Sequence, residues 1–202
     1  MRSRCLAATV FFSALSMAQE GSSNIRVFQA PDGTVVGRQW TDAGKSLFSL
    51  SRDGRAFTAP AEADYTLKLR FAEFDPMLDA PMVPATLAAN ATAGLFIVQY
   101  WTPGLDAYRQ TIGALGGENL LFLANSANVY ALPAETRAAV ASLPFVRAVV
   151  PFHPAYKLEA ALLAAVVAQS GDEVRVNVLT MHRGAPSKVT VGQLVKGLGG
   201  KA

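Results

Sequence analysis

The feature that most constrains the fold is a regular series of apolar runs and turn signals between Gly94 and Val150. Runs typical of buried strands occupy residues 94–101, 119–124, 128–132 and 145–150. Each run is short, rich in β-branched or aromatic residues, and bounded by glycine, proline, asparagine or serine. The pattern therefore predicts four strands, of which the first is buried on both faces.

Two segments with helical spacing separate these strands. Thr102-Pro103 predicts the start of the first helix, because a hydroxyl can cap the helix and proline suits its first position. Gly116-Gly117 predicts its end. The second helix is expected over 133–143, opening at Pro133. The residues expected to face inward from the two helices are Leu105, Tyr108, Ile112, Leu115, Ala139, Val140 and Leu143.

The order β-α-β-β-α-β over residues 94–157 predicts an α+β fold of ferredoxin-like topology. In its last strand either Phe145 and Val149 or Val146 and Val150 face the helices, and the sequence leaves that register open.

Residues 19–93 are expected to form a β-rich segment followed by a proline-rich connector. Asp32-Gly33 and Asp53-Gly54 lie between apolar or β-branched runs and are typical hairpin turns. Residues 65–71 alternate like a half-buried strand, and three prolines between Pro76 and Pro84 indicate an extended connector.

Beyond the ferredoxin-like unit, residues 158–172 predict an alanine-rich helix over 158–168 that packs on the sheet domain. Residues 173–202 resemble the start of a second unit, with a strand over 174–181 and a helix that ends at Gly199-Gly200. IGALGGE (112–118) aligns with VKGLGGK (195–201), which indicates an internal repeat. The second repeat is expected to be incomplete, and poorly ordered or associated with another chain.

The first 18 residues have the layout of a secretory signal peptide: basic residues, a short apolar run, and small residues before an expected cleavage after Ala18. We therefore expect a secreted or periplasmic protein without stable membrane association. The only cysteine, Cys5, lies in this leader, so the mature chain has no disulfide.

Catalytic constellations are absent from the sequence, and we expect the chain not to be an enzyme. It contains no G-x-S-x-G elbow and no Asp, His or Ser block of a subtilisin-like enzyme. The two histidines, His153 and His182, have no third ligand at metal-binding spacing and are interpreted as surface or packing residues. No catalytic, cofactor or metal residue is predicted. A formal charge of +3, without a clustered basic face, argues against a nucleic-acid partner.

Several blocks carry a resemblance to a known family. They are SLSRDGRAFTAP, DYTLKLRFAEFDPMLDAPMVPATL, LFIVQYWTPGLDAYRQTIGALGG, FLANSANVYALPAETRAAVASLPFVRAVVPFHPAYKLE and VRVNVLTMHRGAPSK. From Ser46 onward the chain resembles the N-terminal pro-region of large secreted bacterial subtilisin-like serine peptidases. The combination of ANSANVYALP with LPFVRAVVPFHPAYK contributes most to this resemblance.

The resemblance implies a ferredoxin-like pro-domain that packs on a subtilisin-like catalytic domain, assists its folding and blocks its cleft. That domain is absent here, so the sequence is interpreted as a truncated product or N-terminal fragment, with the partner in cis if a downstream domain exists and otherwise in trans. The alternatives are a free-standing secreted protease inhibitor and a binding module with paired ferredoxin-like units.

The segment PFHPAYK (151–157) is expected to leave the sheet as a stiff, outward-running exit, because its two prolines restrict the backbone. Phe152 and Tyr156 are its large apolar residues. Either they pack back on the sheet domain and the 158–168 helix, or they dock on the partner peptidase domain.

Overall fold

The computed structural model describes residues 24–90, 94–169, 171, 173, 175–181 and 185–201. The predicted signal peptide (1–18), Cys5 and His182 lie outside the described residues, as does Val174, the first residue of the predicted C-terminal strand. The described chain is an α+β protein with antiparallel sheets.

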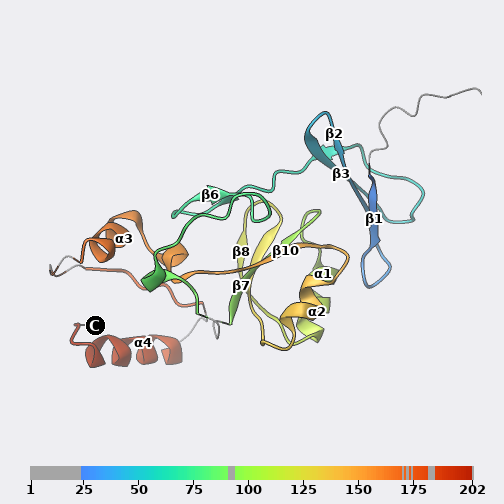
Figure 1. Cartoon of the computed structure of the whole chain (residues 1–202). Coiled ribbons are helices and arrows are strands. Elements are labelled where there is room, and N and C mark those ends of the chain that lie inside the picture. The colour runs from blue at the N-terminus through green and yellow to red at the C-terminus, as the bar shows by residue number, and fades with distance from the viewer. Residues whose placement is uncertain are drawn as a thin grey trace, which may run out of the picture.

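A four-stranded antiparallel sheet forms the centre of the molecule (Figure 1). Its strands are β7 (Leu95–Tyr100), β8 (Glu118–Leu123), β9 (Ala127–Ala131) and β10 (Val146–Pro151). They lie in the spatial order β10-β7-β9-β8. The four predicted strands are confirmed. The chain turns from β8 into β9 at Asn125-Ser126, where both residues have positive φ (61° and 60°).

Helices α1 (Asp106–Ala114) and α2 (Arg137–Ala141) lie together on one face of this sheet (Figure 1). The core beneath them is aromatic: the Tyr108 and Phe145 rings stack with centroids 4.1 Å apart, and the buried Tyr100 and Tyr130 hydroxyls lie 2.8 Å from each other. The other buried members of this core are Phe28, Ala30, Phe96, Val98, Ala107, Ile112, Leu132, Val140 and Val146.

The opposite face of the sheet is covered by segments that flank it in sequence. These are the hairpin of β5 (Leu67–Lys68) with β6 (Glu73–Phe74), and the 3₁₀ turn η2 (Pro154–Lys157); a further turn, η1 (Ala85–Leu87), adds the partly buried Leu87. The buried members of this second core are Leu67, Phe74, Ile97, Ala127, Val129, Phe152, Ala155 and Tyr156. Strand β7 is therefore buried on both faces, as predicted.

The β-rich N-terminal segment is a second antiparallel sheet of β1 (Arg26–Gln29), β2 (Val36–Asp42), β3 (Lys45–Ser51) and β4 (Ala61–Glu62). Phe28 joins this sheet to the helix-side core. It can do so because Gly37 lies opposite it on β2, where a Cβ atom would come within 2.4 Å of the Phe28 ring.

The turns of the N-terminal region differ partly from prediction. Asp32-Gly33 lies between β1 and β2 as expected, with Gly33 at a φ of 73°. The tight β2–β3 turn is at Ala43-Gly44 instead, where both residues have positive φ, and Asp53-Gly54 lies in the longer loop between β3 and β4. The strand predicted over 65–71 is shorter than expected: only Leu67–Lys68 pair, because the chain turns back into β6 within a few residues.

Both helices of the central unit are shorter than predicted. Helix α1 begins at Asp106 without a side-chain cap, because the Thr102 hydroxyl is buried and lies 3.2 Å from the Tyr108 hydroxyl. Helix α2 has five residues, too few for a broad apolar face. Val140 is buried and Leu143 partly buried, but Ala139 is exposed, which corrects its predicted inward orientation.

The last strand follows neither of the two predicted registers over its whole length. Val149 faces the helix side and Val150 the other side, but a bulge between Val146 and Ala148 also places Val146 on the helix side with Phe145. The bulge turns Arg147 towards the opposite face, where its guanidinium meets Gln99.

The C-terminal part contains α3 (Ala160–Val167) and α4 (Ala185–Gly197), which confirms two predicted helices, although neither has a buried residue. The expected packing of the 158–168 helix on the sheet domain is therefore not seen. The strand predicted over 174–181 is also wrong: residues 175–181 form no strand, because none of the sheets in the described part of the chain includes them. Among the described helices, none has the length and apolar character to cross a membrane.

Candidate functional site

The two predicted docking residues lie in the interior. Phe152 is 5% exposed and Tyr156 is 8% exposed. The Tyr156 ring lies 5.5 Å from Phe71 and 5.8 Å from Phe74, measured between centroids. The structure thus favours packing on the sheet domain, and docking through these side chains would require η2 to leave the core.

The exit after β10 folds back against the sheet and does not run outward as predicted. The Phe152 amide donates to the Leu95 carbonyl at 2.9 Å, and Pro154 starts η2 immediately afterwards. His153 accepts a 2.8 Å hydrogen bond at Nδ1 from the Ala89 amide, so it holds the connector in place. Burial lowers the pKa of His153, which keeps Nδ1 available as an acceptor.

A buried ion pair lies on the same side of the sheet. The Arg147 guanidinium donates two hydrogen bonds of 2.7 Å to the Asp75 carboxylate and one of 2.6 Å to the Gln99 side-chain oxygen. The Gln99 amide nitrogen in turn donates to the Tyr65 carbonyl at 2.9 Å. The Arg147 and Asp75 side chains are only 7% and 16% exposed. This network fastens the connector to the sheet.

Aromatic rings complete the surroundings of Arg147. Its guanidinium lies 4.1 Å from the centre of the Tyr65 ring, and burial raises the pKa of Tyr65 to about 12, so the phenol stays neutral. The Tyr65 hydroxyl donates to the Trp101 carbonyl at 2.8 Å. Sequence reasoning missed this network, although its signal was present: Gln99 and Arg147 are polar residues inside runs that otherwise predict buried strands.

No catalytic constellation is found in the described part of the chain. Within it, no group of three or more histidine, cysteine, aspartate or glutamate side chains could hold a metal ion. The strongly shifted pKa values belong to buried tyrosines, whose hydroxyls bond to one another or to main-chain and threonine oxygens. These tyrosines are therefore structural residues of the core.

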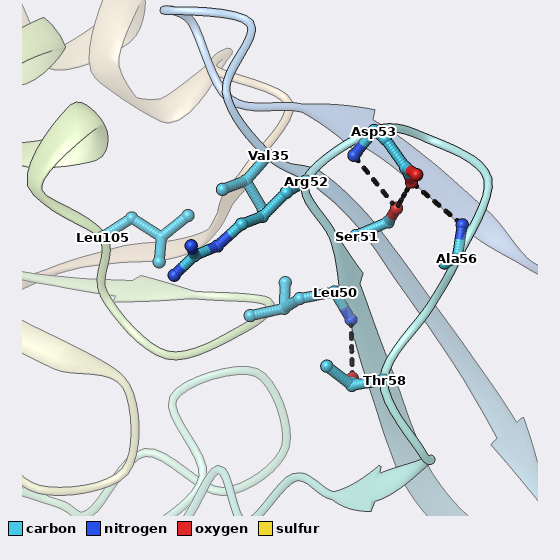
Figure 2. A pocket seen from close by; sticks show the side chains of 8 residues that line it. All are labelled: Val35, Leu50, Ser51, Arg52, Asp53, Ala56, Thr58 and Leu105. Atoms are coloured by element: carbon cyan, nitrogen blue, oxygen red, sulfur yellow. Dashed lines mark hydrogen bonds between the residues drawn. The ribbon is translucent and has the colours of Figure 1, made fainter.

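A cavity of about 540 Å³ lies where the N-terminal sheet meets α1. Its wall is formed by the β1–β2 turn, the end of β3, the following loop and the residue before α1. Figure 2 shows the residues that line it: Val35, Leu50, Ser51, Arg52, Asp53, Ala56, Thr58 and Leu105.

Local hydrogen bonds fix the loop that forms this cavity. The Asp53 carboxylate accepts hydrogen bonds from the Arg55 and Ala56 amides, at 2.8 and 2.9 Å, and from the Ser51 hydroxyl at 2.8 Å. These bonds, led by the one from Arg55, lower the pKa of Asp53. The Thr58 hydroxyl accepts from the Leu50 amide at 3.1 Å. The sequence predicted a turn at Asp53-Gly54 but gave no signal of a cavity.

Comparisons with family models, curated proteins and solved structures found no match to this chain.

Proposed function

We propose that this chain is the non-catalytic pro-region of a secreted subtilisin-like serine peptidase, acting as folding helper and inhibitor of that enzyme. The observation that supports this best is the strand order β10-β7-β9-β8, with α1 and α2 on one face. We infer that this arrangement is ferredoxin-like, which is the architecture that the sequence resemblance implies. Fold alone does not define function, so the proposal also depends on the sequence blocks that carry the resemblance.

The proposed contact with the peptidase domain uses the outer edge of the sheet. Strand β8 is an edge strand of its sheet, and two of its large apolar side chains, Leu121 and Phe122, are 45% and 71% exposed. They lie on opposite faces of the strand, since Leu121 pairs with Val129 and Phe122 with Asn128. An exposed apolar edge strand can pair with a strand of another chain or domain.

The experiment uses the mature chain, residues 19–202, and the catalytic domain of a subtilisin-like peptidase, preferably any domain encoded after Ala202. The chain is added to the active domain, and hydrolysis of a chromogenic peptide is measured. It is also present while the urea-denatured domain refolds. We expect saturable inhibition in the first assay and a higher yield of active enzyme in the second.

A pair of surface variants tests the contact. Phe122→Ser should weaken inhibition about tenfold or more, because a large exposed apolar group would be lost from the interface. Leu198→Ser, which replaces an 80% exposed leucine at the end of α4, should leave inhibition unchanged. The proposed function would be rejected if the chain neither inhibits nor improves the refolding of any subtilisin-like domain tested. Equal inhibition by both variants would reject the β8 edge as the contact surface and leave the proposed function standing.

A further inference from the structure

We propose that the cavity between the N-terminal sheet and α1 binds a small carboxylate with an apolar tail, held at its charged end by Arg52. This inference does not depend on the proposed function, because it concerns a different part of the molecule. It rests on the size of the cavity, on its lining, and on the hydrogen-bonding state of each polar residue in it.

The cavity has the size and composition of a small-molecule site. Its volume of about 540 Å³ lies within the range of ordinary ligand pockets. The aliphatic side chains come from three separate segments: Val35 before β2, Leu50 at the end of β3, and Leu105 before α1. An apolar tail placed between them would be removed from water, which is favourable in proportion to the area buried.

The polar lining residues other than Arg52 are only partly engaged: among the described residues all three bonds of Asp53 end on Oδ1, which leaves Oδ2, and the Thr58 hydroxyl accepts but does not donate. Asp53 accepts three hydrogen bonds within its own loop, one of them from the Ser51 hydroxyl, and Thr58 is bonded to Leu50. The Arg52 side chain, in contrast, makes no hydrogen bond or ion pair with any residue that the structure describes. Figure 2 shows its side chain extending towards Leu105, while the Asp53 carboxylate is directed to Ala56. The donors that a ligand meets are therefore the Arg52 guanidinium and the Thr58 hydroxyl.

This chemistry selects the class of ligand. A guanidinium binds a carboxylate with two parallel hydrogen bonds. The single carboxylate of the lining, Asp53, is too few ligands to hold a metal ion. A phosphate group can accept the same paired bonds, but its second negative charge would lie beside the Asp53 carboxylate. A carboxylate on an aliphatic chain fits both halves of the site. Such a group can come from a medium-chain fatty acid or from the C-terminus of a peptide ending in leucine or valine.

The test is a titration of the ¹⁵N-labelled mature chain, followed by amide chemical shifts. The probes are octanoate and N-acetyl-alanyl-leucine, each compared with its amide. We expect at least one acid to bind saturably with Kd in the millimolar range or below, with shifts in the Leu50–Thr58 loop. The amide should bind about tenfold more weakly or worse, since it cannot form the charge-assisted pair. The acid that binds more tightly identifies the source.

Two arginine variants complete the test. Arg52→Gln should weaken binding of the acid about 10- to 100-fold. Arg55→Gln removes an exposed arginine of the same loop that does not line the cavity, and it should bind like the unaltered chain. Both positions are exposed, so both variants should keep the spectrum of the folded protein. Equal binding of acid and amide, equal binding by Arg52→Gln, or no saturation by either acid would overturn the proposal.

Discussion

Helices α1 and α4 end in the same way but lie in different surroundings. In α1, Gly116 has a φ of 91° and the Gly117 amide donates to the Ile112 carbonyl at 2.9 Å. In α4, Gly199 has a φ of 83° and the Gly200 amide donates to Val195 at the same distance. Yet Ile112 is fully buried, whereas no residue of α4 is buried.

The difference shows which parts of a β-α unit form through local interactions and which need a neighbouring strand. A helix end with two glycines needs only its own backbone bonds, because glycine accepts positive φ at low cost. A strand needs a neighbour to bond its amides and carbonyls. Strand β7 has β9 and β10 as neighbours, while residues 175–181 belong to none of the sheets that the structure describes and are irregular.

The largest expected effect is on amide hydrogen exchange. Amides of β7 and β9 should exchange only through global unfolding, while those of residues 175–181 and α4 should exchange through local opening. For an ordinary domain stability of about 5 kcal/mol, this corresponds to a difference of about 10³-fold or more. Mass spectrometry of peptic peptides measures it. Equal protection of both regions in a monomer would mean that the C-terminal segment has a packing partner.

The second comparison is between a buried and an exposed apolar residue near the ends of the two units. Phe152→Ala should lower the free energy of unfolding by about 3–5 kcal/mol, because it leaves a cavity in the core. Leu198→Ala, on an 80% exposed side chain, should change it by about 0.5 kcal/mol or less. Urea denaturation followed by fluorescence gives both values. A negligible loss for Phe152→Ala, with affinity for a peptidase domain reduced by about 1–3 kcal/mol, would restore the docking interpretation.

The third comparison is between two ion pairs. Asp75→Ala leaves the buried Arg147 guanidinium without its carboxylate and should cost about 3–5 kcal/mol. Glu62→Ala removes the partner of Lys45 from a pair whose side chains are about 60% exposed, and it should cost about 0–1 kcal/mol. Thermal melts at two salt concentrations separate the cases. Similar small losses for both variants would show that the connector is not held by the Arg147 network.

The fourth comparison uses the two aligned aliphatic residues. Ile112→Ala should destabilise the protein by about 2–5 kcal/mol, as expected for a fully buried side chain. Val195→Ala should leave the main unfolding transition in place, because α4 contributes nothing to either core. Differential scanning calorimetry shows both outcomes. A shared loss would indicate that α4 unfolds together with the central sheet.

The sequence predicted the central elements well because each has a complete local signal. Alternating or continuous apolar runs located β7 to β10, and paired glycines located the ends of α1 and α4. Prediction from the sequence failed where tertiary contacts determine the local structure. The buried Thr102 cannot cap α1, the bulge at Arg147 mixes the two registers, and residues 175–181 lack a partner strand.

The candidate sites were harder to predict for the same reason. Arg147 and Asp75 are 72 residues apart, so their pairing depends on how the connector crosses the sheet. The cavity beside Arg52 is assembled from three segments, and none of them carries a binding motif. Phe152 and Tyr156 could be singled out as large apolar residues in an exit segment. Their burial follows from the course of η2 back against the sheet.

The smallest expected effect tests the two helix ends directly. A Cβ atom at Gly117 would lie 2.6 Å from Ile112 Cγ2 and 2.8 Å from Leu132 Cδ2, and both side chains are held in the core. Gly117→Ala should therefore cost about 1–3 kcal/mol through overpacking.

At Gly200 the close side-chain atom is Val195 Cγ1, at 2.7 Å. Val195 is only partly buried and can rotate away, so Gly200→Ala should cost about 0.5 kcal/mol or less. Urea denaturation of the two variants provides the measurement. Equal losses would show that the glycine motif itself, and not its surroundings, determines the cost.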